Sequence, residues 1–386
     1  MTGAALATPS AGWAAAIRAR LAAFGRPPRI LGVDLARGLA VLGMFGAHVG
    51  VTAEELDATR PETWTAIVDG RSAILFALLA GVSIAILSGG AAPVRGEALL
   101  RARLRVLARG GTVLLLGLLL ELLGTGVAVI LPVYGALFVL SVLVLGVRVR
   151  WLLAGSAALA LLAPVAVTLV GPDTAGSLDP LLLGVYPVPI WMSFVLTGMA
   201  VGRLDLRSLR VRVMLAVAGL ALMGLGYGLG GALAASAAGP FGAAQTTGPG
   251  SEALERLGAL LTIAPHSGSP FEVLGSTGFA LAALALCLAI ARSLRWPLLP
   301  LAALGSMPLS AYIGHLLAIA ALLGTAGTQE DQSAWLAFSA VALAACALWM
   351  VLLGRGPVER LLALVADLAS GDAARRLRRG DPGSRL

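Results

Sequence analysis

The sequence predicts an all-α polytopic membrane protein, and three observations support this class. Hydrophobic residues make up 58% of the 386 residues and charged residues only 12%, whereas about 25% is usual in soluble domains. The mean hydropathy is +0.92. The apolar residues form runs of about 20, the length that crosses a hydrocarbon core. Because backbone groups in lipid must be hydrogen-bonded within their own segment, we expect each run to be a helix.

The pattern of apolar runs predicts about ten membrane spans. Their expected limits are residues 30–51, 66–89, 104–123, 126–147, 151–170, 184–202, 210–235, 271–291, 299–323 and 334–354. Residues 1–29 then form an N-terminal tail, residues 30–354 the membrane domain, and residues 355–386 a basic C-terminal tail. Two outer connections, 52–65 and 236–270, are long enough to suggest a functional role.

Charge asymmetry predicts the orientation of these spans. The net charge is +8, and all 28 basic residues are arginine because the chain has no lysine. Arginines follow the even-numbered spans, whereas the opposite connections are acidic; only Arg60 and Arg256 depart from this pattern. The positive-inside rule therefore predicts that both termini are cytoplasmic. It also explains the basic charge without nucleic-acid binding, since no aromatic-studded basic surface accompanies it.

Cysteine and motif searches exclude several kinds of chemistry. Cys287 and Cys346 lie inside apolar runs, where a thiol usually serves as a small packing group. We expect neither a disulfide framework nor a metal site. The chain contains no nucleophile elbow, HExxH helix or Walker motif.

The three histidines are the main candidates for proton transfer. His48, His266 and His315 all fall on the predicted outer side of the membrane, and histidine exchanges protons near neutral pH. Asp69 and Glu121 are the carboxylates predicted at similar depth, where either one is able to orient a histidine. The alternative for each histidine is a neutral ring hydrogen-bonded between helices.

Charged residues near the span ends are open to two interpretations. Asp34 and Arg37 are three residues apart and share a helix face, so they form either part of a site or a structural ion pair. Asp69 and Arg71 are able to neutralise one another in the same way. Four arginines on the predicted cytoplasmic side either bind an anionic ligand or contact lipid headgroups; they are Arg37, Arg101, Arg103 and Arg105.

Several motifs together resemble those of one family. The segments VDLARGLA at 33–40, DGRS at 69–72, FALLAGVS at 76–83, APHSGSPFE at 264–272, GSMPLSAYIGH at 305–315 and GPVE at 356–359 occur in this order. They resemble segments of the bacterial relatives of heparan-α-glucosaminide N-acetyltransferase, which include the YeiB-like membrane proteins. The similarity covers about residues 29–362.

This resemblance implies a transmembrane acyltransferase of the bacterial plasma membrane. Its donor would be acetyl-CoA, bound from the cytoplasm through Arg37, Arg101, Arg103 and Arg105, and its acceptor an extracytoplasmic sugar, glycan or amine. The resemblance carries the role of general base to His48, which His266 or His315 either shares or replaces, and we expect Asp69 or Glu121 to orient it. Arg71, Glu272 and Tyr312 are expected at the acceptor. No metal is expected, and a homodimer is left open.

One departure from the family pattern concerns the catalytic histidine. The eukaryotic enzyme has an asparagine near the end of its first span and its histidine in the following luminal stretch. Here His48 occupies the asparagine-like position, and residues 52–68 contain no histidine. A histidine at the end of the first span also resembles the broader acyltransferase-3 proteins. The alternative function is a small-solute transporter with a histidine and carboxylate proton relay.

Overall fold

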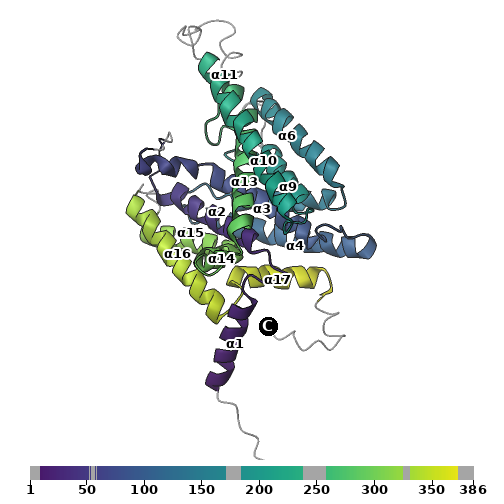
Figure 1. Ribbon diagram of the computed structural model, residues 1–386, viewed down its shortest axis with the longest axis vertical. Helices are drawn as coiled ribbons and strands as arrows, with labels where there is room; N and C mark the ends of the chain where they lie inside the picture. The colour runs from purple at the N-terminus through teal and green to yellow at the C-terminus, as the bar shows by residue number, and fades with distance from the viewer. Residues whose placement is uncertain are drawn as a thin grey trace, which may run out of the picture.

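The computed structural model describes residues 9–51, 53, 57, 59–170, 184–237, 258–324 and 331–372. Across these residues the chain forms helices and no strand, which confirms the predicted all-α class (Figure 1). Part of the predicted charge pattern lies outside the described residues: Glu54, Glu55, Asp173, Asp179, Glu252, Glu255, Arg256, Glu330, Arg375, Arg376, Arg378 and Arg379.

The first half of the chain forms several of the helices that line the candidate site described below. Its elements are α1 (Pro9–Ala23), α2 (Leu31–Val49), the 3-10 helix η1 (Pro61–Ile67), α3 (Arg71–Leu87), α4 (Gly96–Glu121), α5 (Leu131–Ser141), the 3-10 turn η2 (Val142–Val144) and α6 (Val149–Val170).

The second half of the chain adds helices that pack against α2 and α3. They are α9 (Val188–Val201), α10 (Leu209–Met223), the π-helix η4 (Gly224–Leu229), α11 (Gly230–Ala237), α13 (Pro270–Ile290), α14 (Leu299–Ser306), α15 (Pro308–Leu322), α16 (Gln332–Leu352) and α17 (Pro357–Ala369). The last helix lies within the predicted C-terminal tail and packs against α4.

Every predicted span coincides with one helix or with two or three consecutive helical segments, but fewer meet a strict test of length and apolar character. Within the described residues, five helices pass this test, or six if the bent pair α14 and α15 counts as one span. Two more predicted spans are shorter apolar helices, Leu131–Val144 and Val188–Val201. The remaining two, α2 and α4, carry charged residues in their first turns.

Close contacts between backbones hold the central helices together. A Cβ atom on Gly305 of α14 would overlap the carbonyl oxygen of Asp34 in α2, and one on Gly38 would overlap the carbonyl oxygen of Leu301. The pair formed by Gly81 and Gly198 joins α3 to α9 in the same manner. Small residues allow such approach between membrane helices. This packing explains the glycines in three of the motifs.

The ninth predicted span is broken rather than continuous. Helices α14 and α15 meet at an angle of 87°, and Pro308 occupies the first turn of α15, where its missing N–H costs nothing. The Glu359 carboxylate accepts hydrogen bonds from the backbone N–H groups of Leu309 (2.9 Å) and Ser310 (3.2 Å). Glu359, from the GPVE motif, therefore caps the exposed start of α15.

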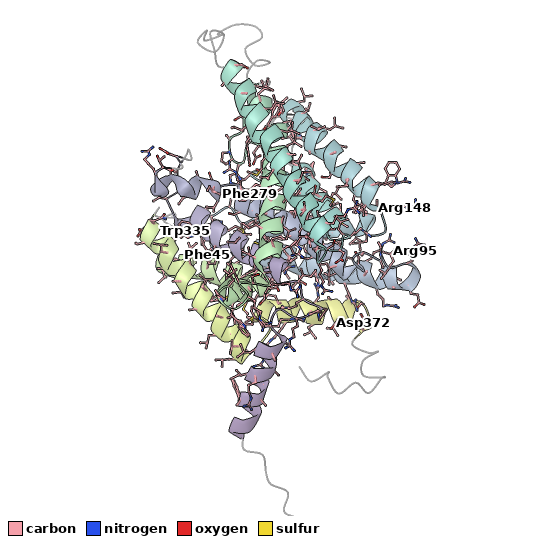
Figure 2. All side chains as sticks on the ribbon, in the orientation of Figure 1. Phe45, Arg95, Arg148, Phe279, Trp335 and Asp372 are labelled. Carbon is pink, nitrogen blue, oxygen red and sulfur yellow. The ribbon has the colours of Figure 1, made fainter. Side chains whose placement is uncertain are left out.

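The charged side chains of the predicted cytoplasmic segments gather on one side of the molecule. Figure 2 shows Arg95, Arg148 and Asp372 on the same side, and Trp335 on the other. Asp372 pairs with Arg105, and Arg20 donates to the last carbonyls of α16.

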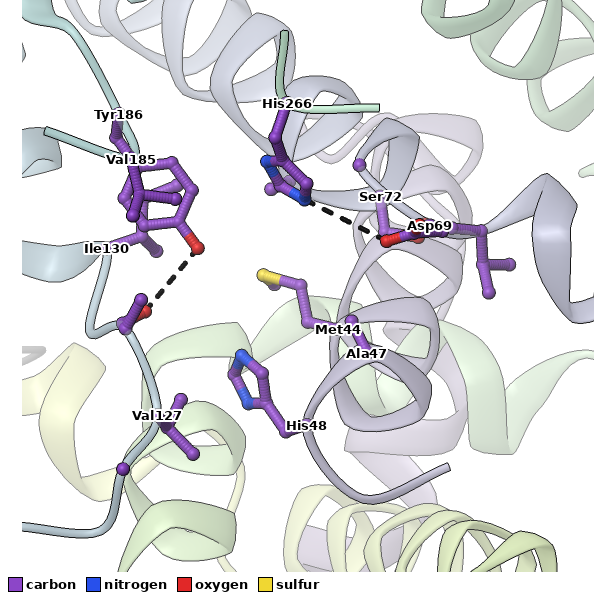
Figure 3. Close-up of a pocket in the computed structure, with 15 residues that line it drawn as sticks. Met44, Ala47, His48, Asp69, Ser72, Val127, Ile130, Val185, Tyr186 and His266 are labelled. Atoms are coloured by element: carbon purple, nitrogen blue, oxygen red, sulfur yellow. Dashed lines mark hydrogen bonds and ion pairs between the residues drawn. The ribbon is translucent and has the colours of Figure 1, made fainter. Parts of the chain in front are cut away.

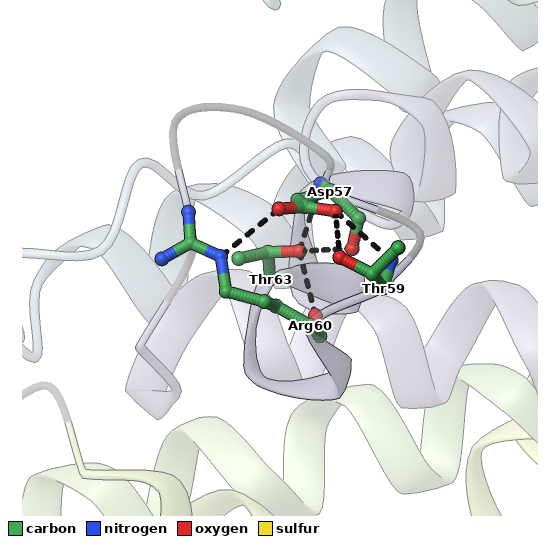
Figure 4. A network of polar contacts seen from close by, with 4 residues as sticks. All are labelled: Asp57, Thr59, Arg60 and Thr63. Carbon is green, nitrogen blue, oxygen red and sulfur yellow. Dashed lines mark hydrogen bonds and ion pairs between the residues drawn. The ribbon is translucent and has the colours of Figure 1, made fainter.

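The described part of the predicted outer loop is ordered by Asp57. Its carboxylate accepts hydrogen bonds from the backbone N–H and the hydroxyl of Thr59 (2.9 and 2.7 Å) and pairs with Arg60 at 3.0 Å (Figure 4). The Thr63 hydroxyl closes the turn by donating to backbone carbonyls. Arg60, an exception to the predicted charge pattern, is thus neutralised locally.

Candidate acyl-transfer site

Two of the predicted histidines line one cavity of about 250 Å3, which we call the histidine cavity. His48 enters it from the last turn of α2, and His266 from the loop that precedes α13 (Figure 3). The cavity is lined by Met44, Ala47, His48, Val68, Asp69, Gly70, Ser72, Ala73, Gly126, Val127, Ala128, Ile130, Val185, Tyr186 and His266.

The third histidine, His315, contacts His48 but does not line the histidine cavity. His48 Nδ1 and His315 Nε2 are 2.7 Å apart and share a hydrogen bond, and the two rings stack with centroids 5.0 Å apart. His315 is only 4% exposed, and its Nδ1 atom has no well-formed hydrogen bond; the nearest acceptors are backbone carbonyls one turn earlier in α15. Because His48 Nδ1 is occupied, Nε2 is its free nitrogen.

The loop that carries His266 is fixed by a capping box at the start of α13. The Ser269 hydroxyl accepts a hydrogen bond from the Glu272 N–H (3.0 Å), and the Glu272 carboxylate accepts one from the Gly268 N–H (3.0 Å). His266 itself has a φ of 60°, a left-handed conformation that few non-glycine residues adopt. The buried Glu272 therefore holds the loop rather than lining the cavity.

His266 and Asp69 form the second polar pair of the cavity. His266 Nε2 lies 3.8 Å from Asp69 Oδ1, and their side chains are 33% and 30% exposed. Burial lowers the pKa of His266, and the negative charge of Asp69 partly opposes that shift. His266 is therefore mainly neutral at pH 7, and its ring lies beside the Asp69 carboxylate at a distance longer than a direct hydrogen bond.

The remaining residues expected at the acceptor or catalytic centre lie elsewhere. Glu121 is exposed at the end of α4 and does not line the cavity. Arg71 points to another interface, where its Nε donates to the Tyr227 hydroxyl at 2.9 Å. Tyr312 is 1% exposed and packs edge-on against the rings of both stacked histidines.

A second cavity of about 230 Å3, the arginine cavity, lies toward the other end of the same helices. Arg37, Arg109 and Arg355 line it from α2, α4 and the turn before α17, together with apolar side chains such as Phe76 and Phe138. Arg37 pairs with Asp34 at 2.9 Å and donates to Ser83 at 2.8 Å. The ion pair of Arg37 therefore forms and lies at a cavity wall, and a role of Arg37 in binding stays a prediction.

The other predicted arginines do not reach this cavity. Arg101 pairs with Glu97 at 3.1 Å on an exposed face of α4, Arg103 is exposed, and Arg105 pairs with Asp372. Arg109 instead points inward, and its buried Nε has no hydrogen-bond partner among the described residues. A signal for Arg109 exists in the sequence, since it follows Arg105 by four residues and so lies on the same helix face.

Sequence reasoning also missed the aromatic residues of the site. The chain has only four tyrosines. Tyr186 lines the histidine cavity, with its ring 6.0 Å from that of His266, and Tyr134 lines the arginine cavity. The scarcity of tyrosine was the available signal, because a phenol inside an otherwise apolar helix needs a polar partner.

No cluster suited to a metal ion occurs among the described residues, which were searched for groups of three or more His, Cys, Asp or Glu side chains. The histidines are engaged with each other and with one carboxylate.

The fold and the two cavities define a class: a helical membrane protein with a histidine site near one end of its core helices and a basic site near the other. A comparison with protein families identifies the family. Residues 29–226 match the model of the heparan-alpha-glucosaminide N-acetyltransferase catalytic domain, and the chain belongs to that family. A search of curated proteins found no match. The family assignment implies acyltransferase activity in general. The match contains His48, Asp69 and Arg109, whereas His266 and His315 lie beyond it.

Proposed function

We propose that the protein transfers an acetyl group from acetyl-CoA, bound in the arginine cavity, to an acceptor hydroxyl or amine in the histidine cavity. The observation that carries this proposal is that the two cavities are lined by the same helices. Arg37 and His48 are both on α2 and are 11 residues apart, which corresponds to about 16 Å along a helix. The charge asymmetry of the sequence supports a cytoplasmic donor and an extracytoplasmic acceptor.

The arginine cavity suits the donor because it combines positive charge with an apolar wall. Coenzyme A carries several phosphates, and guanidinium groups bind phosphate through paired hydrogen bonds. The buried Nε of Arg109 has no hydrogen-bond partner among the described residues. Arg355 also lines an adjoining cavity of about 280 Å3, which Arg20 and Arg29 line as well. Further basic side chains therefore lie beside the arginine cavity. The apolar residues would accommodate the pantetheine arm.

The hydrogen bond between the stacked histidines determines how His48 acts as a base. To accept a proton on Nε2, neutral His48 must carry its own proton on Nδ1 and donate it to His315 Nε2. His315 is then protonated on Nδ1, which faces backbone carbonyls. When His48 becomes an imidazolium, its bond to His315 strengthens. His315 therefore orients the ring and stabilises its charge, as the third member does in other nucleophile–base systems.

The proposed reaction is a single acyl transfer. The acceptor O–H or N–H loses its proton to His48 Nε2 while the acceptor atom attacks the thioester carbonyl. The C–S bond then breaks, and the thiolate takes a proton from the imidazolium to leave as free coenzyme A. His266, paired with Asp69, and Tyr186 would hydrogen-bond the acceptor on the opposite wall of the cavity.

One structural feature favours a transporter as the second candidate function. Broken helices commonly form transporter binding sites because their free ends bind ions, and the α14–α15 pair is broken. Here, however, Glu359 already occupies the start of α15. The acyltransferase therefore accounts for more of the structure.

The experiment that separates the two functions uses purified protein in liposomes. Acetyl-CoA is added with a panel of sugar and amine acceptors, and free thiol is measured. Acceptor-dependent thiol release that His48→Ala abolishes supports acyl transfer. Solute flux without coenzyme A release at any acceptor would support the transporter and reject the proposal.

A further inference from the structure

The histidine and arginine cavities are lined by consecutive positions on the same helix faces. Ile130, the N-cap residue of α5, lines the histidine cavity, while Tyr134 and Phe138, one and two turns later, line the arginine cavity. On α3, Ala73 belongs to the histidine cavity and Phe76 to the arginine cavity. Residues three or four apart lie on one helix face. The two cavities are therefore neighbours along the same interface between α2, α3 and α5.

Tyr134 contacts the walls of both cavities. Its hydroxyl donates a 2.7 Å hydrogen bond to the carbonyl oxygen of Ala73, so a side chain of the arginine cavity is bonded to the wall of the histidine cavity. The residue is 2% exposed. Its ring packs against Phe76 at 5.3 Å and Trp191 at 6.4 Å between centroids.

This hydrogen bond is not needed to satisfy the backbone. Ala73 is in the first turn of α3, inside a regular helix, where its carbonyl has an acceptor role within the helix already. The bond therefore fixes the position of the Tyr134 side chain rather than completing α3. It is also a weak restraint, since one hydrogen bond of ordinary strength shifts an equilibrium by about two- to tenfold.

We propose that Tyr134 is the gate between the two cavities, and that it must swing away from Ala73 to let the acyl arm of the donor reach His48. The inference rests on the proposed function for the identity of the arm, but not for the path between the cavities. With the bond made, the aromatic ring separates the cavities. With the bond broken, the same helix faces line one slender passage suited to a linear chain ending in a thioester.

A cysteine-accessibility experiment tests the gate without any acetyl-CoA. In a background with Cys287→Ser and Cys346→Ala, Met44→Cys places a thiol in the histidine cavity, into which the Met44 side chain projects (Figure 3). A small, charged methanethiosulfonate is then applied from the arginine-cavity side of oriented vesicles. Labelling from the opposite side measures whether each variant keeps an intact histidine cavity.

Tyr134→Phe should raise the labelling rate from the arginine-cavity side by about two- to tenfold, because it removes one hydrogen bond. Tyr134→Ala should raise it further, because it also removes the ring. Tyr227→Phe is the matched control, since it removes a tyrosine hydroxyl that hydrogen-bonds to Arg71 and lines neither cavity, and it should leave the rate unchanged.

Equal labelling in the parent and in both Tyr134 variants, with the opposite side still accessible, would overturn the gate. So would an equal rise in Tyr227→Phe. If Tyr134→Phe opens the path but the parent protein transfers no acetyl group to any acceptor, only the proposed function is rejected.

Discussion

Replacing His315 by Phe is the most informative perturbation of the proposed base. The substitution keeps ring packing against Phe45, whose ring centroid is 4.4 Å away, but removes the partner of His48 Nδ1. A neutral hydrogen bond is worth about 0.5–1.5 kcal/mol and one to a charged group about 1.5–3 kcal/mol. Because the neutral bond is also lost from the ground state, only the difference between the charged and the neutral bond, about 1–1.5 kcal/mol, raises the activation free energy. We therefore expect kcat to fall by about five- to tenfold.

The assay is the rate of thiol release from acetyl-CoA at saturating donor and acceptor. The KM for acetyl-CoA should not change, because His315 is remote from the arginine cavity. Tyr312→Phe provides a control, since it keeps an aromatic ring beside the same histidines and should retain the parent rate. His48→Ala should cost about 10²–10⁴ in rate.

The double variant distinguishes a positioning role from an independent one. If His315 acts only through His48, then His48→Ala with His315→Phe should be no slower than His48→Ala alone. A parent-like rate in His315→Phe would refute the reasoning. A further five- to tenfold loss in the double variant would refute it equally.

Three other predictions concern charge, capping and pH. Arg109→Gln should raise the KM for acetyl-CoA while the exposed Arg103→Gln does not; equal KM values would remove Arg109 from the donor site. Glu359→Ala should lower the free energy of unfolding by about 0.5–2 kcal/mol through loss of the α15 cap, measured by thermal unfolding in detergent, and an unchanged melting temperature would contradict that role. Because the pKa of His266 is lowered in the fold, its contribution to stability is present above its unfolded pKa of about 6.5 and is lost as the pH falls. His266→Asn, which tolerates the left-handed backbone, should therefore lose less stability than the parent between pH 7 and pH 5, and parallel pH profiles would contradict the shift.

The fold class could be predicted because it depends on composition, which is visible along the whole chain. Runs of apolar residues specify helices wherever lipid forbids unpaired backbone groups. The break between α14 and α15 was harder to predict, since Pro308 permits either a kink or a new helix start. What decides it is Glu359, about 50 residues later, and no local pattern shows that contact.

The histidines could be selected because ionisable groups within spans are rare. The pairing of His48 with His315 could not be predicted, because it depends on the direction in which α15 runs from the break toward α2. Arg109, which lines the arginine cavity, was also not identified from the sequence. Arg101, Arg103 and Arg105 are close to Arg109 in sequence, and Arg105 shares its helix face. Arg105 lies one turn nearer the start of α4, however, where it pairs with Asp372, so of these four arginines only Arg109 lines the cavity.

Sidedness of label transfer tests the central proposal most directly. Protein is reconstituted in liposomes with radiolabelled acetyl-CoA on the arginine-cavity side and a responsive acceptor only on the histidine-cavity side. The account predicts acetylated acceptor on the far side, free coenzyme A on the near side, and loss of both in His48→Ala. Labelled acceptor that forms only when both substrates are on the same side would contradict it.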